Sequence, residues 1–155
     1  PHRLSEPYEA LRKRADGYKA KTGTFPQIFL ANLGKVAQHT ARAMFARNFF
    51  EAGGIEAITN TGFADAKSVA KAFTASGAKI AVICGSDPQY GDMATDVAST
   101  LKTAGASLVY LAGHPGDARA GYEAAGIDDF IYVGTDVPDT CRTAMDHLSG
   151  ARGDK

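Results

Sequence analysis

The feature that most constrains this fold is a unit of apolar run, polar turn and amphipathic helix between Phe25 and Gly54. The run Ile28–Ala31 is too short for a buried helix and is followed directly by turn residues, which is typical of a buried β-strand. Beyond it, apolar residues at helical spacing mark one face of a helix: Ala41, Met44, Phe45, Phe49 and Ala52. Gly53-Gly54 ends that helix, so the stretch is predicted to be strand, loop and helix.

The same unit recurs along the chain, and each recurrence predicts one strand and one helix. The further strands are Ile55–Ile58, Ile80–Cys84, Leu108–Ala112 and Phe130–Val133. Five such units predict an α/β fold with a doubly wound, five-stranded parallel sheet. The most apolar runs are the first, third and fourth, which favours the flavodoxin-like strand order 2-1-3-4-5 because that order buries these three in the middle.

The residues before the first strand predict a separate helix. Arg3 to Tyr18 carries a narrow apolar stripe made of Leu4, Tyr8, Leu11, Ala15 and Tyr18. Two interpretations stay open: the stripe packs on its own domain, or it packs on a neighbouring domain or partner. We expect residues 1–24 to be a helical linker from a preceding domain, 25–148 to be the α/β domain, and 149–155 to be a disordered tail.

Composition excludes several classes of function. Lys plus Arg equals Asp plus Glu at 17 each, so no overall field attracts nucleic acid or an anionic membrane. No apolar run approaches the roughly 20 residues of a membrane helix. The two cysteines lie inside predicted elements, which indicates reduced thiols and a cytoplasmic protein. The chain opens Pro1-His2 without a methionine, and we expect it to be part of a longer protein.

In a doubly wound sheet the strand-to-helix loops meet at the carboxyl edge, where ligands bind. Four of the five loops carry glycine directly after the strand: Gly34, Gly85, Gly113 and Gly134. Glycine there lets a ligand approach the backbone closely, so this edge is predicted to form an extended groove. Ordinary turn chemistry is the alternative explanation.

Familiar sites are absent from these loops. The chain has no G-x-G-x-x-G after the first strand and no G-x-x-x-x-G-K-[ST], which argues against a dinucleotide or nucleoside triphosphate site. The acidic residues of a phospho-acceptor domain and a G-x-S-x-G elbow are also missing. His39, His114 and Asp87 could together bind zinc, but solvated loop histidines are the commoner case. Cys84 and Cys141 are expected to be core residues.

Residues from about Pro26 to Leu148 resemble the cobalamin (B12)-binding domain of methylmalonyl-CoA mutase. The stretch FLANLGKVAQHTARAMFARNFFEAGGIEA is most similar to the small, non-catalytic subunit of the heterodimeric bacterial enzyme. The helix from Arg3 to Tyr18 is similar to the one that joins the barrel domain to the B12 domain in that family.

The resemblance implies a cobalt site at a D-x-H-x-x-G motif after the first strand. There the histidine is the lower axial ligand of cobalt, and the aspartate hydrogen-bonds the other ring nitrogen. In this chain His39 fills the histidine position, Ala37 stands at the aspartate and Arg42 at the glycine. Arg42 adds bulk where the cofactor would pass, although it could also pair with the phosphate of its nucleotide tail.

The other family contacts are partly kept. Gly85-Ser86 matches a Ser-rich turn at the cofactor tail, Ala112-Gly113 matches a Gly-Gly pair, and Gly134-Thr135 with Pro138 matches Gly-Thr-x-x-Pro. By this resemblance the cofactor-binding residues would be His39, Ser86, Gly113, Gly134 and Thr135, in vestigial form.

The resemblance implies a degenerate domain without catalytic residues. It would be the structural partner of a large catalytic subunit, which holds adenosylcobalamin and isomerises methylmalonyl-CoA to succinyl-CoA in propionate metabolism. The alternative is a working cobalamin site with His39 as the cobalt ligand and Ser86, Gly113 and Gly134 along the groove. A third interpretation is a sensory or interaction module that binds another ligand in the same groove.

Overall fold

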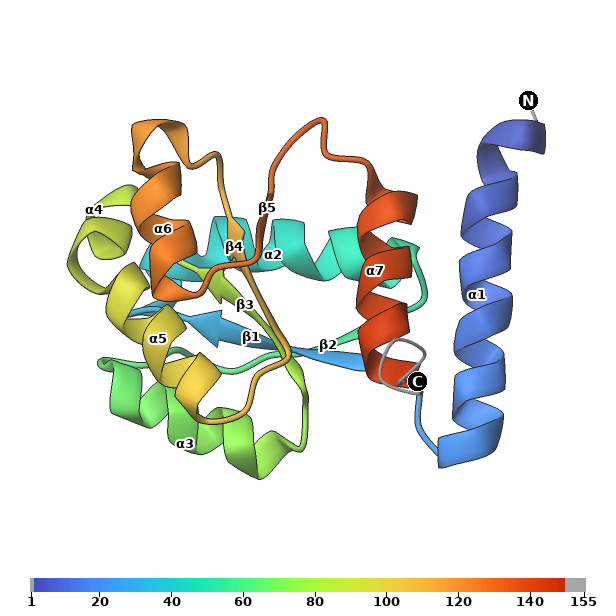
Figure 1. The fold of residues 1–155 in the computed structure, drawn as a ribbon, viewed down its shortest axis with the longest axis horizontal. Helices are drawn as coiled ribbons and strands as arrows, with labels where there is room; N and C mark the ends of the chain where they lie inside the picture. Colours follow the sequence, from blue (N-terminus) through green and yellow to red (C-terminus); the bar gives the residue numbers. More distant parts are fainter. Residues whose placement is uncertain (1, 150–155) are drawn as a thin grey trace.

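The described residues fold around one five-stranded parallel sheet (Figure 1). The computed structural model describes residues 2–149, with side chains from Glu6 onward. The strands are β1 (Gln27–Asn32), β2 (Glu56–Ile58), β3 (Ile80–Cys84), β4 (Leu108–Ala112) and β5 (Asp129–Ile131). They pair in parallel in the order β2-β1-β3-β4-β5, which confirms the predicted fold class and strand order.

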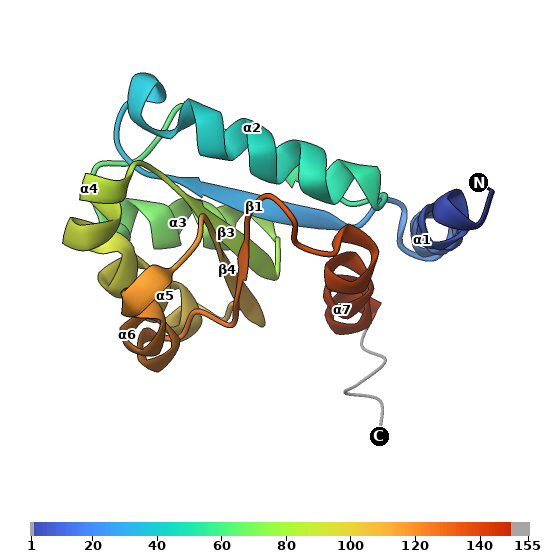
Figure 2. The same cartoon turned by 90° about the horizontal axis from the view of Figure 1, so that it is seen from above.

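Helices cover both faces of the sheet. The longer ones are α1 (His2–Thr22), α2 (Val36–Ala52), α3 (Ala66–Ser76), α5 (Thr95–Thr103), α6 (Arg119–Ala125) and α7 (Val137–Ser149). Three short pieces are α4 (Asp87–Gln89), the π-helical turn η1 (Tyr90–Ala94) and the 3₁₀ turn η2 (Gly116–Ala118). Figure 2 shows α2 on one side of the sheet and α5 and α6 on the other.

The core has two layers because successive strand residues point to opposite faces. On β1, Ile28 and Leu30 pack with α2 and α7, while Phe29 and Ala31 pack with α3 and α5. All five residues of β3 are fully buried, as expected for a central strand that is covered on both faces. The candidate site therefore lies at the end of a strand that is buried on both faces.

Several boundaries differ from the sequence prediction, and three of them affect the site. Helix α2 begins at Val36, because the amide of Lys35 donates to Gln38 Oε1 at 2.9 Å and starts the helix early. His39 is consequently a helical residue and not a loop residue. Residues 87–92 are helical, in α4 and η1, where we expected a loop from Gly85 to Asp92. Strand β5 ends at Ile131 because the amide of Tyr132 donates to Thr135 Oγ1.

Helix α1 packs on this domain beside α7 (Figures 1 and 2). Leu11 and Ala15 are buried, and a Cβ placed at Gly54 would lie 2.9 Å from the Cβ of Ala15. Of the two interpretations of the stripe, packing on its own domain is the observed one for these residues. The side chain of Leu4 and the predicted tail beyond Ser149 lie outside the described residues, and a preceding domain stays a prediction.

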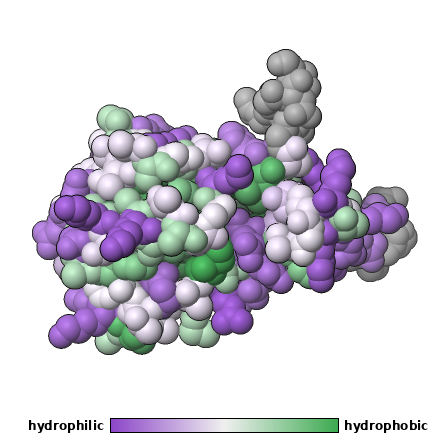
Figure 3. All heavy atoms as spheres, turned by 90° about the horizontal axis from the view of Figure 1, so that it is seen from below, coloured by the Kyte–Doolittle hydropathy of each residue, from purple (hydrophilic) through white to green (hydrophobic). Residues whose placement is uncertain are grey.

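The surface is largely polar. Figure 3 shows one face, on which hydrophobic residues form small, separated groups among hydrophilic ones. Within residues 2–149, none of the helices combines the length and the hydrophobicity that a membrane crossing requires. The large hydrophobic side chains described as exposed are Val36, Met44 and Val133.

Candidate functional site

Over the ends of β3 and β4, the carboxyl edge of the sheet is crossed by the side chain of Arg42. This residue lies on α2, and its Nη1 donates to the carbonyl of Gly85 at 2.9 Å. The same nitrogen forms an ion pair with Asp87 Oδ1 at 2.9 Å, and the guanidinium carbon lies 5.1 Å from the centre of the Tyr90 ring. Arg42 thus links α2 to the loop after β3 across the predicted groove.

Beneath Arg42, the hydroxyl of Tyr90 joins the ends of β3 and β4. Its oxygen accepts the amide hydrogen of Gly85 at 3.0 Å. It donates toward the carbonyl of Ala112 at 2.6 Å, with the carbonyl of Ile83 also within reach at 3.1 Å. Tyr90 is only 5% exposed, so this hydroxyl satisfies backbone groups that would otherwise be buried without partners. Sequence analysis did not identify Tyr90.

The glycines after the strands are approached by side chains of the protein itself. At Gly34 an added Cβ would collide with Gln38 and Gln89. At Gly85 it would lie 3.0 Å from Gln89 Oε1, and at Gly113 it would lie 3.3 Å from the guanidinium carbon of Arg42. The close approach that the sequence predicted at these three positions is therefore made by internal side chains. The extended groove is not present over β1 and β3.

His39 points into the interior. Its side chain is 3% exposed, and Nδ1 lies 3.2 Å from the carbonyl oxygen of Leu33. A Cβ placed at Gly62 would lie 2.7 Å from its Cε1, so the loop after β2 covers the ring closely. These contacts are those of a histidine packed in the core with a backbone partner.

An asparagine pair beside His39 was also missed by the sequence analysis. Asn32 is fully buried at the end of β1, and its Nδ2 donates to Asn60 Oδ1 at 3.2 Å. Asn60 in turn donates to the carbonyl of Leu30 at 2.9 Å, which ties the loop after β2 to β1. Oδ1 of Asn32 has no hydrogen-bond partner among the described residues, and a hollow of about 130 Å³ adjoins it.

Burial and charge together set the protonation states in the filled part of the edge. Burial by itself lowers the pKa of Arg42, but the hydrogen bond and charge of Asp87 outweigh it, so the pKa is raised and the cation is favoured. Burial raises the pKa of the Cys84 thiol and of the Tyr90 hydroxyl far above their usual values. Cys84 therefore stays a neutral thiol and is no nucleophile at neutral pH.

The part of the edge over the ends of β4 and β5 is also hollow. A groove of about 420 Å³ is lined there by Arg42, Phe45, Ala112, Gly113, His114, Ile131, Tyr132 and Val133. Gly134 lies beside it with nothing within 4 Å of an added Cβ, and Thr135 Oγ1 is engaged by the amide of Tyr132. Ser86 is used locally as well, since its hydroxyl donates to Gln89 Oε1 at 3.3 Å.

The three candidate zinc ligands have separate partners. His39 faces the carbonyl of Leu33, Asp87 pairs with Arg42, and the ring of His114 lies 4.7 Å from that of Tyr132. Across the part of the chain that the structure describes, no group of three His, Cys, Asp or Glu residues could hold a metal ion.

Sequence comparison relates the chain to one group of enzymes. It is 42% identical over 149 residues to the methylmalonyl-CoA mutase small subunit of Streptomyces virginiae, which covers 96% of this chain and 23% of that protein. It is 44% identical over 112 residues, or 72% of this chain and 18% of the other, to a probable methylmalonyl-CoA mutase small subunit of Mycobacterium tuberculosis. The chain thus spans about a fifth to a quarter of these curated relatives. None of the protein-family profiles matches it.

Solved structures agree on the fold. A cobalamin-binding protein from Desulfitobacterium hafniense superposes with a TM-score of 0.58 at 20% identity, over 88% of this chain and 65% of that one. A signal receiver domain of a putative LuxO repressor protein from Vibrio parahaemolyticus gives a TM-score of 0.50 at 13% identity, over 83% and 94% of the two chains. The chain is therefore homologous, over nearly its whole length, to a segment of methylmalonyl-CoA mutase small subunits, and it has the flavodoxin-like fold that a cobalamin-binding protein shares.

Proposed function

We propose that this domain is a degenerate cobalamin-type domain of a methylmalonyl-CoA mutase small subunit. On this proposal it does not hold the cofactor and has no catalytic residue. It serves as a structural partner of the large subunit, which binds adenosylcobalamin and converts methylmalonyl-CoA to succinyl-CoA. The similarity to small subunits supports the assignment to this enzyme.

The observation that carries the proposal is the position of Arg42. Its side chain occupies the place between α2 and the loop after β3, and it is fixed there by the Gly85 carbonyl and the Asp87 carboxylate. A charge-assisted contact of this kind is stronger than a neutral one. A ligand entering over the end of β3 would have to displace Arg42 and expose the buried hydroxyl of Tyr90.

The orientation of His39 supports the same conclusion. A metal-ligating histidine needs one ring nitrogen open to the metal, while the other donates to a carboxylate, a backbone carbonyl or water. Here Nδ1 faces the Leu33 carbonyl, but the ring is only 3% exposed and the position of the family aspartate is Ala37. The low exposure and the missing carboxylate therefore argue against cobalamin bound in the manner of the family.

A visible-absorption titration with hydroxocobalamin and adenosylcobalamin, followed by desalting, tests cofactor binding. We expect the wild-type protein to leave the column colourless. The double variant Ala37→Asp/Arg42→Gly restores the motif and should retain more cobalamin than the matched control Ala37→Asp/Arg47→Gly, since Arg47 lies on the exposed side of the same helix. Cobalamin that wild type retains and that His39→Ala loses would overturn the proposal in favour of a working site.

Association with the large subunit needs its own measurement. The chain and a large subunit of the mutase would be mixed and analysed by sedimentation velocity. A complex that forms without cobalamin, together with unchanged turnover in His39→Ala, supports a structural role. If the two proteins sediment separately at all concentrations used, this domain is not the segment that holds the partner.

A further inference from the structure

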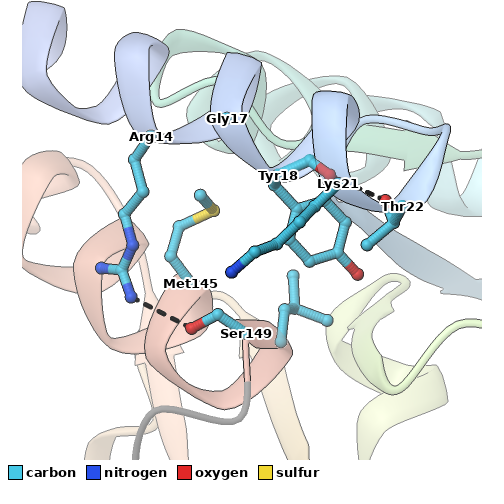
Figure 4. A pocket seen from close by; sticks show the side chains of 8 residues that line it. Arg14, Gly17, Tyr18, Lys21, Thr22, Met145 and Ser149 are labelled. Atoms are coloured by element: carbon cyan, nitrogen blue, oxygen red, sulfur yellow. Dashed lines mark hydrogen bonds between the residues drawn. The ribbon is translucent and has the colours of Figure 1, made fainter.

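A second hollow lies far from the carboxyl edge, between α1 and α7. It measures about 480 Å³ and is lined by Arg14, Gly17, Tyr18, Lys21 and Thr22 of α1 and by Met145, Leu148 and Ser149 of α7. Figure 4 shows the side chains of Arg14, Lys21 and Met145 directed into the space between the two helices. None of these residues belongs to the site described above.

Two basic side chains, Arg14 and Lys21, line the groove in a chain without net charge. Lys21 makes no ion pair or hydrogen bond to any residue that the structure describes. Arg14 is held in place by Asp146 Oδ1 at 2.7 Å and by Ser149 Oγ at 3.2 Å. An ammonium group without a partner is thus placed beside a fixed guanidinium.

Besides the basic side chains, a glycine in the middle of α1, Gly17, also indicates a binding site in the groove. It lies in the middle of α1, where glycine is among the least favourable residues, and its backbone is helical without a positive φ. An added Cβ would have nothing within 4 Å, so neither the helix nor the packing of this domain requires glycine. Its effect is to keep the groove open opposite the apolar side chains of Met145 and Leu148.

We propose that the groove between α1 and α7 is a docking site for an acidic, partly apolar segment of another protein. Carboxylates of that segment pair with Lys21 and with the free edge of Arg14. An apolar side chain of the segment enters between the helices over Met145 and Leu148, and its backbone passes close to Gly17. Apolar contact between two helices with flanking opposite charges is a common way to bind an amphipathic helix.

Titration of the isotope-labelled chain, monitored by NMR, tests this site. The probe is a short capped peptide with glutamates on one helical face and leucines on the other. We expect its chemical-shift changes to gather at Gly17, Lys21, Leu148 and Ser149. Lys21→Glu should weaken binding about tenfold, and the same peptide with lysine in place of glutamate should then prefer that variant over wild type.

Gly17→Leu is the decisive variant because it fills the groove without removing a charge. It should abolish peptide binding while the melting temperature is kept, since leucine is a good helix former. Gly121→Leu is its matched control: Gly121 is also exposed and helical, with nothing within 4 Å of an added Cβ, and it should bind as wild type.

Three results would overturn the proposal. One is a Gly17→Leu protein that binds the peptide as tightly as wild type. Another is a poly-uridine RNA that binds the same residues more tightly than the peptide and is unaffected by Gly17→Leu, which would indicate nucleic acid as the ligand. The third is a deletion of residues 150–155 that shifts the groove resonances and tightens peptide binding, because the chain's own end would then be the occupant.

Discussion

The glycines that follow the strands have different surroundings in the two halves of the carboxyl edge. Over β1, β3 and β4, the space next to Gly34, Gly85 and Gly113 is taken by Gln89, Tyr90 and Arg42. Over β5, the space next to Gly134 stays empty, and Val133 beside it is 88% exposed. A glycine after a strand permits close approach in both halves, but what approaches is decided by side chains on other elements.

The difference also separates stability from ligand access. In the filled half the Tyr90 hydroxyl pairs internally with the Gly85 amide and the Ala112 carbonyl, so a ligand there would first have to break hydrogen bonds of the fold. In the hollow half it would not. Variants that compare the two halves therefore measure how much of the stability of the domain depends on the side chains that fill the edge.

The largest effect is expected at Tyr90. Tyr90→Ala should lower the free energy of unfolding by about 3–5 kcal/mol, since it leaves a cavity under Arg42. Tyr90→Phe should cost about 1–3 kcal/mol, because the Gly85 amide and the Ala112 carbonyl lose their partner. Urea denaturation measures both. Tyr132→Phe in the hollow half is the control and should change stability by less than about 0.5 kcal/mol; equal losses for the two Tyr→Phe variants would contradict the comparison.

The next largest effect is expected at alkaline pH, which should lower the free energy of unfolding through Cys84 in the filled half. Burial raises the pKa of Cys84 above its ordinary value of 9.0, so the folded protein keeps the proton while the unfolded chain releases it. The stabilisation is complete below pH 9 and is lost as the pH rises above it, by at most about 1.4 kcal/mol per pH unit for this group. Cys84→Ala should therefore lose less stability than wild type between pH 8 and about 10.5.

The pH comparison has a matched variant on α7, at the C-terminal end of α2. Burial raises the pKa of Cys141 to about 12, and this residue packs against Gly53 and not at the edge. Cys141→Ala should reduce the alkaline loss in the same direction. If the free energy of unfolding falls with pH equally in wild type and in both variants, neither thiol contributes to the alkaline loss of stability.

The smallest effect is the difference in stability between alanine substitutions at two glycines. Gly113 (φ 138°) and Gly134 (φ 99°) both have a conformation that alanine adopts with strain, at about 1 kcal/mol or more each. Gly113→Ala should cost about 0.5–1 kcal/mol more than Gly134→Ala, because its Cβ would lie 3.3 Å from Arg42. In an Arg42→Ala background this excess should disappear in a thermal melt, and an excess that persists would place its origin in the backbone.

The sheet could be predicted because its information is local in sequence. The all-apolar runs at β1, β3 and β4 indicate burial on both faces, and Glu56 marks β2 as the edge strand that it is. The start of α2 was placed too late, since the interaction of Gln38 with the Lys35 amide competes with the turn that the sequence suggests.

The filling of the site was predicted only in part. The bulk of Arg42 at a glycine position of the family motif is visible in the sequence, and so is the loss of the aspartate at Ala37. That Arg42 reaches Asp87 and Tyr90 depends on the spacing between α2 and the loop after β3, which no local pattern encodes. Tyr90 could have been found only from the proximity of the ends of β3 and β4.

The π-helical turn at Tyr90–Ala94 sets the direction of the Tyr90 side chain relative to α5. A π turn is commonly an α-helix with one residue inserted, and each residue of an α-helix advances the side-chain direction by about 100°. Loss of one residue from this turn would therefore change the direction of Tyr90 relative to α5, so the length of the turn decides whether both can keep their present contacts.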